Sequence, residues 1–65
     1  MPVIRVALDV PVNILFDYLA PDITAQDIGT RVCVPFGRKV AAGIIMEGAT
    51  YSSVPPDKLK SALRI

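Results

Sequence analysis

The chain has 65 residues and a net charge of only +1, from seven Lys and Arg against six Asp and Glu. This length allows one domain, and the near-neutral charge excludes a protein that grips a long track of phosphates. Histidine is absent and Cys33 is the single cysteine, which excludes an internal disulfide and a conventional zinc site. The predicted protein is therefore small and apolar, and its setting is reducing and cytoplasmic.

The first half of the chain predicts two strands. Residues 3–10 are rich in Val and Ile and lie between Pro2 and Pro11, as is typical of a strand. Residues 14–20 alternate, with Phe16, Tyr18 and Ala20 on one face. A polar connector follows, in which Asp22 or Thr24 is a candidate cap for a short helical turn.

The second half predicts a hairpin. Residues 31–36 alternate clearly, and Pro35, which has no amide hydrogen, predicts a strand edge or a bulge. Gly37 predicts a turn, with Arg38 and Lys39 near its tip, and residues 40–49 return as an apolar strand. Gly43 inside that strand predicts a bulge or a bend.

The C-terminal residues 51–65 allow two interpretations. A loop over 51–57 contains Pro55-Pro56. Residues 58–65 fit either a helix or a strand, because Leu59 and Leu63 suit both periodicities.

Catalysis finds little support in the sequence. No histidine is available as a general base, and Cys33 is best explained as a small packing residue. The stretch GIIMEGAT, residues 43–50, matches a phosphate loop except that Ala49 replaces the lysine that reaches the phosphates, so a glycine-bent strand explains it better. We therefore predict no catalytic residues, no metal site and no cofactor in this chain.

Two short motifs suit the binding of a nucleic acid. In FDY, Phe16 and Tyr18 offer rings for stacking and Asp17 offers an acceptor. Taken alone, this motif is better explained by two core rings beside a solvated surface acid. In PFGRK, Gly37 permits close approach of a ligand to the backbone, while Arg38 and Lys39 can meet a phosphate. A hairpin turn with charges for solubility explains this second motif equally well.

The motifs FDYL and, twelve residues later, RVCVPFG lie in a chain that opens with MPV and continues through Gly43-Ile44 and Leu59-Lys60. In this order they resemble the N-terminal 3′ DNA-binding domain of the PriA (primosomal protein N-prime) family of bacterial replication-restart helicases. The resemblance covers nearly the whole chain, 1–65. It implies a mainly β fold: a small twisted antiparallel sheet, or partly open barrel, of about five strands with little helix.

The resemblance also implies a function. The domain would recognise the 3′-terminal nucleotide, with its free 3′-hydroxyl, of the nascent leading strand at stalled replication forks, whatever the base sequence. The implied pocket residues are Phe16, Asp17, Tyr18, Gly37 and Lys60, and the accessory phosphate contacts are Arg38 and Lys39. Residues 58–65 would then be a strand.

The same resemblance implies that the domain continues past residue 65 in the family, so that this chain is truncated and lacks the helicase core. ATP, Mg and Zn, and the ATP-dependent 3′–5′ unwinding of DNA at forks to give single-stranded DNA, would belong to that core and not to this chain. Other helicase domains and primosome proteins would be partners, and no membrane would be involved. The alternative is a protein-interaction module that pairs through the edge at Pro35 and the apolar strand 40–46.

Overall fold

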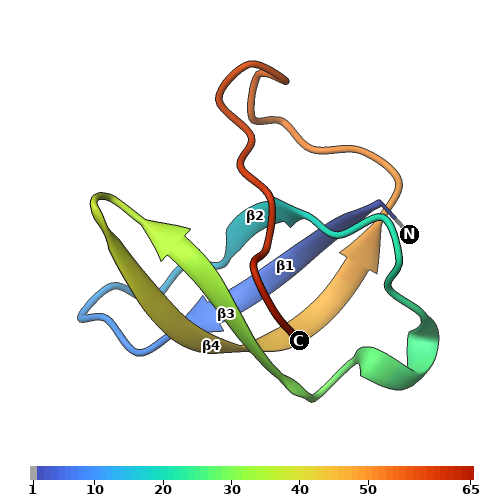
Figure 1. The fold of residues 1–65 in the computed structure, drawn as a ribbon, viewed down its shortest axis with the longest axis horizontal. Coiled ribbons are helices and arrows are strands. Elements are labelled where there is room, and N and C mark those ends of the chain that lie inside the picture. Colours follow the sequence, from blue (N-terminus) through green and yellow to red (C-terminus); the bar gives the residue numbers. More distant parts are fainter. Residues whose placement is uncertain (1) are drawn as a thin grey trace.

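The computed structural model describes residues 2–65, which fold into a single antiparallel sheet (Figure 1). Its elements are β1 (Val3–Leu8), β2 (Phe16–Leu19), the short 3₁₀ helix η1 (Ala25–Asp27), β3 (Arg31–Phe36) and β4 (Lys39–Ala49). The predicted β fold is confirmed, and the four strands predicted between residues 3 and 49 are present with bounds that differ by two residues at most.

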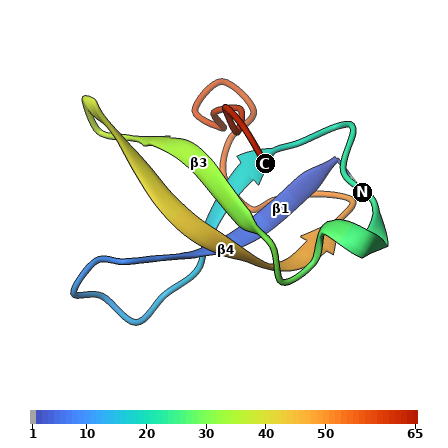
Figure 2. The same cartoon turned by 60° about the horizontal axis from the view of Figure 1, so that its bottom comes forward.

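The strand order across the sheet is β2-β1-β4-β3, and every pair is antiparallel. The sheet curls into a half-barrel whose edges are β2 and β3. Figure 2 shows the β3–β4 hairpin and the loop between β1 and β2 projecting from one end of the sheet. The prediction that Pro35 lies at an edge is correct, because β3 is an edge strand.

The concave side of the sheet holds the core. Alternate residues of the strands point inward, and the five largest fully buried side chains are Ile4, Val6, Val32, Val34 and Ile45. Burial of each side chain of this kind contributes about 1.5–3 kcal/mol. Tyr18, Ala20 and Ile23 complete the cluster, so the inward face predicted for β2 is correct at Tyr18 and Ala20.

Residues 60–65, here called the closing segment, run between β2 and β3 and join the two edges of the sheet (Figure 1). Leu19 exchanges hydrogen bonds with Lys60 and Ala62, and Cys33 exchanges them with Leu63 and Arg64, at N–O distances of 2.7–2.9 Å for the four shortest. The helical interpretation of residues 58–65 is therefore wrong, and the strand interpretation is right only in part. The segment is extended but forms isolated bridges, because its two ends bond to different strands.

The two glycines of the hairpin have different roles. Gly37 has φ +62° and, with Arg38, forms a two-residue turn of the type that needs glycine in its first position. The predicted bulge at Gly43 is wrong: the register shifts between Arg5 and Val6, which places the extra residue near Met46. A Cβ at Gly43 would lie 2.6 Å from the carbonyl oxygen of Ala7, so this glycine permits close packing of β4 on β1.

The connector between β2 and β3 contains the predicted helical turn. Of the two candidate caps, Thr24 precedes η1, and its N–H donates to the Asp27 carboxylate at 2.9 Å. The turn lies at the end of the sheet away from the hairpin tip (Figure 1), so it does not contribute to the site described next.

Candidate nucleic-acid interface

One concave pocket of about 200 Å³ lies between β2, the tip of β3 and the loop before the closing segment. We call it the seam pocket, and its lining consists of Phe16, Asp17, Tyr18, Pro35, Phe36, Gly37, Val54, Lys58 and Lys60. All five residues that the family resemblance selected are among these nine. The fold brings them together from three regions of the chain that are distant in sequence.

The pocket exists because the gap between the two edge strands is only half filled. Along β2, Leu19 directs its N–H and C=O to the closing segment, and Asp17, two residues earlier, directs its own groups to the same side. No main-chain partner within residues 2–65 bonds to these groups of Asp17. The seam pocket is thus the open half of the gap, and a ligand there meets an unpaired strand edge.

A tyrosine hydroxyl spans the floor of this open half. Tyr18 donates to the carbonyl oxygen of Pro35 at 2.7 Å, which connects β2 directly to β3. The Tyr18 side chain is buried in the core, and this burial raises the pKa of its hydroxyl above 10.0. Its ring is therefore not available for stacking on a base, and its contribution to the pocket is to fix the distance between the walls.

Phe16 and Phe36 form the aromatic wall. Their ring centroids are 5.2 Å apart at an interplanar angle of 85°, an edge-to-face pair, and both residues are partly exposed. The sequence analysis did not select Phe36 as a pocket residue. Its position directly before Gly37, in the phase of Val32 and Val34, is the signal that points to it.

Asp17 lies on the outer face of β2, and its carboxylate already has partners. Ser52 Oγ donates to Oδ2 at 2.5 Å, and Arg5 Nε lies 3.6 Å from Oδ1. Arg5 also contacts Glu47 at 3.3 Å. The Asp17 side chain is 12% exposed. A carboxylate has about four lone-pair positions, so a ligand can still reach this one while Ser52 and Arg5 hold it.

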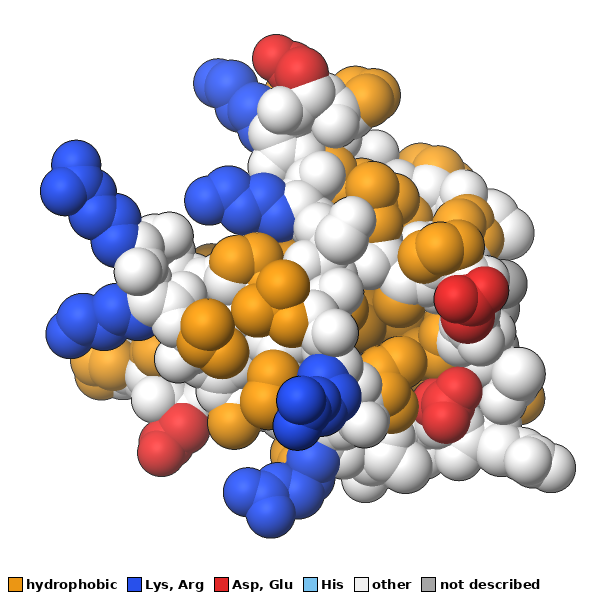
Figure 3. Space-filling view, viewed as in Figure 1, with side chains coloured by type: hydrophobic (Ala, Val, Ile, Leu, Met, Phe, Trp, Pro, Cys, Tyr) orange, Lys and Arg blue, Asp and Glu red, His pale blue; other side chains and the backbone are white. Residues whose placement is uncertain are grey.

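Cations surround the mouth of the seam pocket. Lys58 and Lys60 line it, Arg38 is next to Gly37 in the turn, and Lys39 is the cross-strand partner of Phe36. Four of the seven Lys and Arg residues of the chain are therefore in or beside this pocket. Figure 3 shows basic side chains projecting around the hairpin tip and the loop above it. The net charge of +1 gives no indication that basic residues cluster at this pocket. Lys58 was not selected from sequence, because the path of its loop is set by tertiary contacts.

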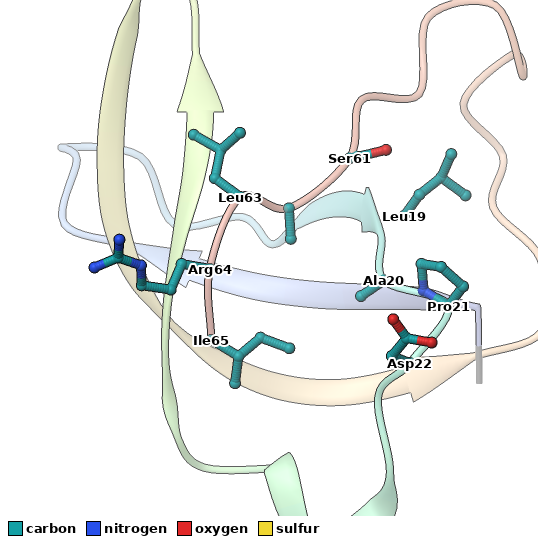
Figure 4. A pocket seen from close by; sticks show the side chains of 9 residues that line it. Leu19, Ala20, Pro21, Asp22, Ser61, Leu63, Arg64 and Ile65 are labelled. Carbon is teal, nitrogen blue, oxygen red and sulfur yellow. The ribbon is translucent and has the colours of Figure 1, made fainter.

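A second cavity, of about 220 Å³, lies beside the filled half of the gap (Figure 4). Its lining is mostly apolar, from Leu19 to Pro21 and from Ala62 to Ile65. In Figure 4 the Arg64 head group points away from this cavity, whereas the Asp22 carboxylate lies at its border. An acid without a facing cation does not suit a phosphate, so this cavity is a poorer nucleic-acid site than the seam pocket.

Residues 2–65 contain neither a cluster suited to a metal ion nor a helix suited to a membrane. No group of three or more His, Cys, Asp and Glu side chains is placed to hold a metal ion. Across the same residues, no helix has both the length and the apolar character needed to cross a membrane.

Comparison with known proteins identifies the family. Residues 5–65 match the family described as the PriA 3′ DNA-binding domain (3′BD). The chain is 48% identical over 64 residues to the replication restart protein PriA of Haemophilus influenzae, covering 98% of this chain and 9% of that protein. It is 40% identical over 45 residues to PriA of Buchnera aphidicola, covering 69% of this chain and 6% of that protein. The chain thus spans less than a tenth of the length of these relatives, and it belongs to the family of PriA 3′ DNA-binding domains.

Proposed function

We propose that this chain binds the 3′-terminal nucleotide of a DNA strand, with its free 3′-hydroxyl, and does so without regard to base sequence. The strand would be the nascent leading strand at a stalled replication fork. One observation carries the proposal: Phe16, Asp17, Tyr18, Gly37 and Lys60 line a single pocket in a chain of the 3′ DNA-binding family.

The size and walls of the seam pocket support a terminal nucleotide as ligand. About 200 Å³ is below the ~300–1,000 Å³ of sites for drug-sized ligands, so the pocket suits one nucleotide and not a length of strand. The wall of Phe16 and Phe36 is apolar and aromatic, and every base has a π-face, so such a wall tolerates all bases. Gly37 adds no side chain where the ligand would approach.

The charges support a hydroxyl end over a phosphate end. An ionised Asp17 only accepts hydrogen bonds, and a 3′-hydroxyl is a donor, so the two match. A 3′-phosphate would bring negative charge next to that carboxylate and would be repelled. Lys60 and Lys58 can meet the phosphate on the 5′ side of the terminal sugar, with Arg38 and Lys39 as accessory contacts to the next one.

The wider role is proposed from the relatives. Both are named replication restart proteins, so we propose that the domain acts in the cytoplasm as part of such a protein, alongside helicase and other primosome components. ATP hydrolysis and unwinding, with the Mg and Zn they require, would depend on regions of the relatives that this chain does not span. We propose that this chain needs no cofactor to bind DNA.

The alternative, a protein-interaction module that pairs through the β3 edge, has less support. The outward groups of Cys33 already bond to the closing segment, and the carbonyl of Pro35 accepts from Tyr18. Pro35 has no N–H to offer, so little of this edge remains for another strand. Apolar side chains on β4, including Val40 and Met46, are exposed. They are the one feature of the fold that still supports the interaction module.

The test is fluorescence anisotropy with three single strands of one sequence, each labelled at the 5′ end. They end in a 3′-hydroxyl, in a 3′-phosphate and in a bulky 3′ block. We expect tightest binding to the free hydroxyl, and the same preference when the terminal base is changed. Equal binding to all three would indicate a general single-strand binder, and no binding to any would favour the interaction module.

A further inference from the structure

We infer that Ser52 is a positioning residue for the seam pocket: its hydroxyl holds the Asp17 carboxylate in the orientation that selects a 3′-hydroxyl. The inference rests on the proposed function and adds a residue that neither the sequence motifs nor the pocket lining selected. It is carried by two hydrogen bonds of the Ser52 hydroxyl, one to the distant Asp17 and one to the nearby Val54.

Ser52 lies behind Asp17 as seen from the pocket. Ser52 Oγ donates to Asp17 Oδ2 at 2.5 Å, across 35 residues of sequence, and the contact is partly buried. Asp17 lines the seam pocket, whereas Ser52 lines a neighbouring hollow together with Pro2, Val3 and Tyr51. Ser52 therefore does not line the pocket that would hold the ligand, and it can influence that ligand only through the residues it holds.

The same hydroxyl also fixes a pocket wall. The N–H of Val54 donates to Ser52 Oγ at 3.0 Å, and Val54 lines the seam pocket. The hydroxyl thus accepts from one wall residue and donates to another, which uses its single proton and one lone pair. One side chain sets the separation between β2 and the loop that leads to Lys58 and Lys60.

Arg5 explains why the carboxylate needs this second partner. It lies on β1 directly opposite Asp17, with Nε 3.6 Å from Oδ1, and it shares its charge with Glu47. With Ser52 removed, the carboxylate would be free to turn toward the guanidinium and form a paired contact there, since Arg offers a fork of donors. That rotation would draw both oxygens toward the outer face of β1 and away from the pocket.

The experiment compares Ser52→Ala with the neighbouring control Ser53→Ala, because Ser53 is exposed and no side-chain hydrogen bond of the described residues involves it. Affinities for 3′-hydroxyl and 3′-phosphate strands are measured by anisotropy after circular dichroism has shown that each variant is folded. We expect Ser52→Ala to lose roughly 3- to 10-fold in affinity for the hydroxyl end, in the range of coupled neighbouring residues, and to lose most of the preference for hydroxyl over phosphate. Ser53→Ala should keep both within about twofold, as for a surface change.

Two further comparisons separate positioning from a general loss of structure. Ser52→Thr keeps the hydroxyl and should keep the preference for hydroxyl over phosphate ends. Ser52→Val has the shape of threonine without the hydroxyl and should lose that preference. The double variant Asp17→Ala/Ser52→Ala should show the same preference between hydroxyl and phosphate ends as Asp17→Ala alone, because Ser52 acts on that preference through Asp17. Equal selectivity in Ser52→Val and Ser52→Thr, or additive losses of the hydroxyl preference in the double variant, would overturn the inference.

The outcomes also distinguish this inference from the proposed function. If the unaltered chain shows no preference for a 3′-hydroxyl, the proposed function fails and the inference fails with it. If the unaltered chain has the preference and Ser52→Ala and Ser52→Val retain it, the pocket stands and only the role of Ser52 is wrong.

Discussion

Replacing Tyr18 by Phe removes a single oxygen atom from the floor of the seam pocket and leaves the core ring in place. That oxygen donates to the Pro35 carbonyl at 2.7 Å, and the Tyr18 residue is 5% exposed. Cys33 bonds to the closing segment. Nearer the hairpin tip, Pro35 has no N–H, and its carbonyl bond from Tyr18 is the hydrogen bond that connects the outer edge of β3 to β2. Tyr18→Phe therefore tests whether the two edges of the half-barrel are held together at the pocket.

The expected cost is about 1–1.5 kcal/mol in the free energy of unfolding. An intramolecular hydrogen bond contributes about 0.5–1.5 kcal/mol net, and a buried carbonyl left unpaired costs about 1–3 kcal/mol. The lower part of that second range applies here, because the carbonyl borders an open pocket that water can enter. For a domain of this size, 1 kcal/mol corresponds to a fall in Tm of roughly 4–8 °C.

Tyr18 also predicts the pH dependence of this difference. Burial raises the pKa of its hydroxyl in the folded state above 10.0, so the folded state favours the protonated form. The resulting contribution to stability is complete below pH 10 and is lost as the pH rises through the folded-state pKa. The difference between the unaltered chain and Tyr18→Phe should therefore be constant from neutral pH to about pH 9 and should shrink above pH 10.

The assay is urea and thermal unfolding followed by circular dichroism, with Tyr51→Phe as the matched control. Tyr51 is 74% exposed and no hydrogen bond of its hydroxyl occurs within residues 2–65, so the control should unfold like the unaltered chain. Equal stability of the Tyr18→Phe variant and the unaltered chain, or an equal loss in both variants, would mean that the Tyr18–Pro35 hydrogen bond does not hold the two edges together.

Three other substitutions test the site and the sheet. Asp17→Ala should weaken binding to a 3′-hydroxyl strand by about 1–3 kcal/mol, the value of a charge-assisted hydrogen bond; anisotropy measures it, and unchanged affinity would remove Asp17 from the pocket. Lys60→Gln should make the slope of log affinity against log salt less steep by about 0.7 for one lost single-strand phosphate contact, and an unchanged slope would assign that contact elsewhere. Gly43→Ala places a Cβ 2.6 Å from the Ala7 carbonyl oxygen and should lower the free energy of unfolding in urea by about 3 kcal/mol. The control Ala42→Ser, at an exposed site, should change it little. A stable Gly43→Ala variant would mean that β1 and β4 can separate without loss of stability.

Most of the secondary structure could be predicted because it depends on local patterns. The alternation of Val32, Val34 and Phe36 defines β3, and glycine at 37 is required by the positive φ of its turn. The bulge predicted at Gly43, as one of two alternatives, is not found there. Glycine in a strand indicates either a bulge or a close neighbour, and only the register with β1 decides between them.

The candidate site was predicted from resemblance and not from local physics. FDYL and VPFG are each explained by core packing or turn formation when taken alone. Their joint position around one pocket depends on the pairing of β1 with β2 and on the path of residues 51–65. Phe36, Lys58 and Ser52 were missed for that reason. Phe36 and Ser52 acquire their roles from contacts with Phe16 and Asp17, and Lys58 from lining a pocket whose other walls are distant in sequence.

Composition and period-2 alternation act over a few residues. They are therefore enough to specify a small mainly β domain with these strands and this hairpin turn, without histidine chemistry. The tertiary structure decided where the half-barrel closes and where it stays open. Closure depends on long-range hydrogen bonds of Leu19 and Cys33 to a C-terminal segment whose own pattern fitted both helix and strand. Local periodicity does not reveal the unpaired half of that gap, where we propose that the end of a DNA strand binds.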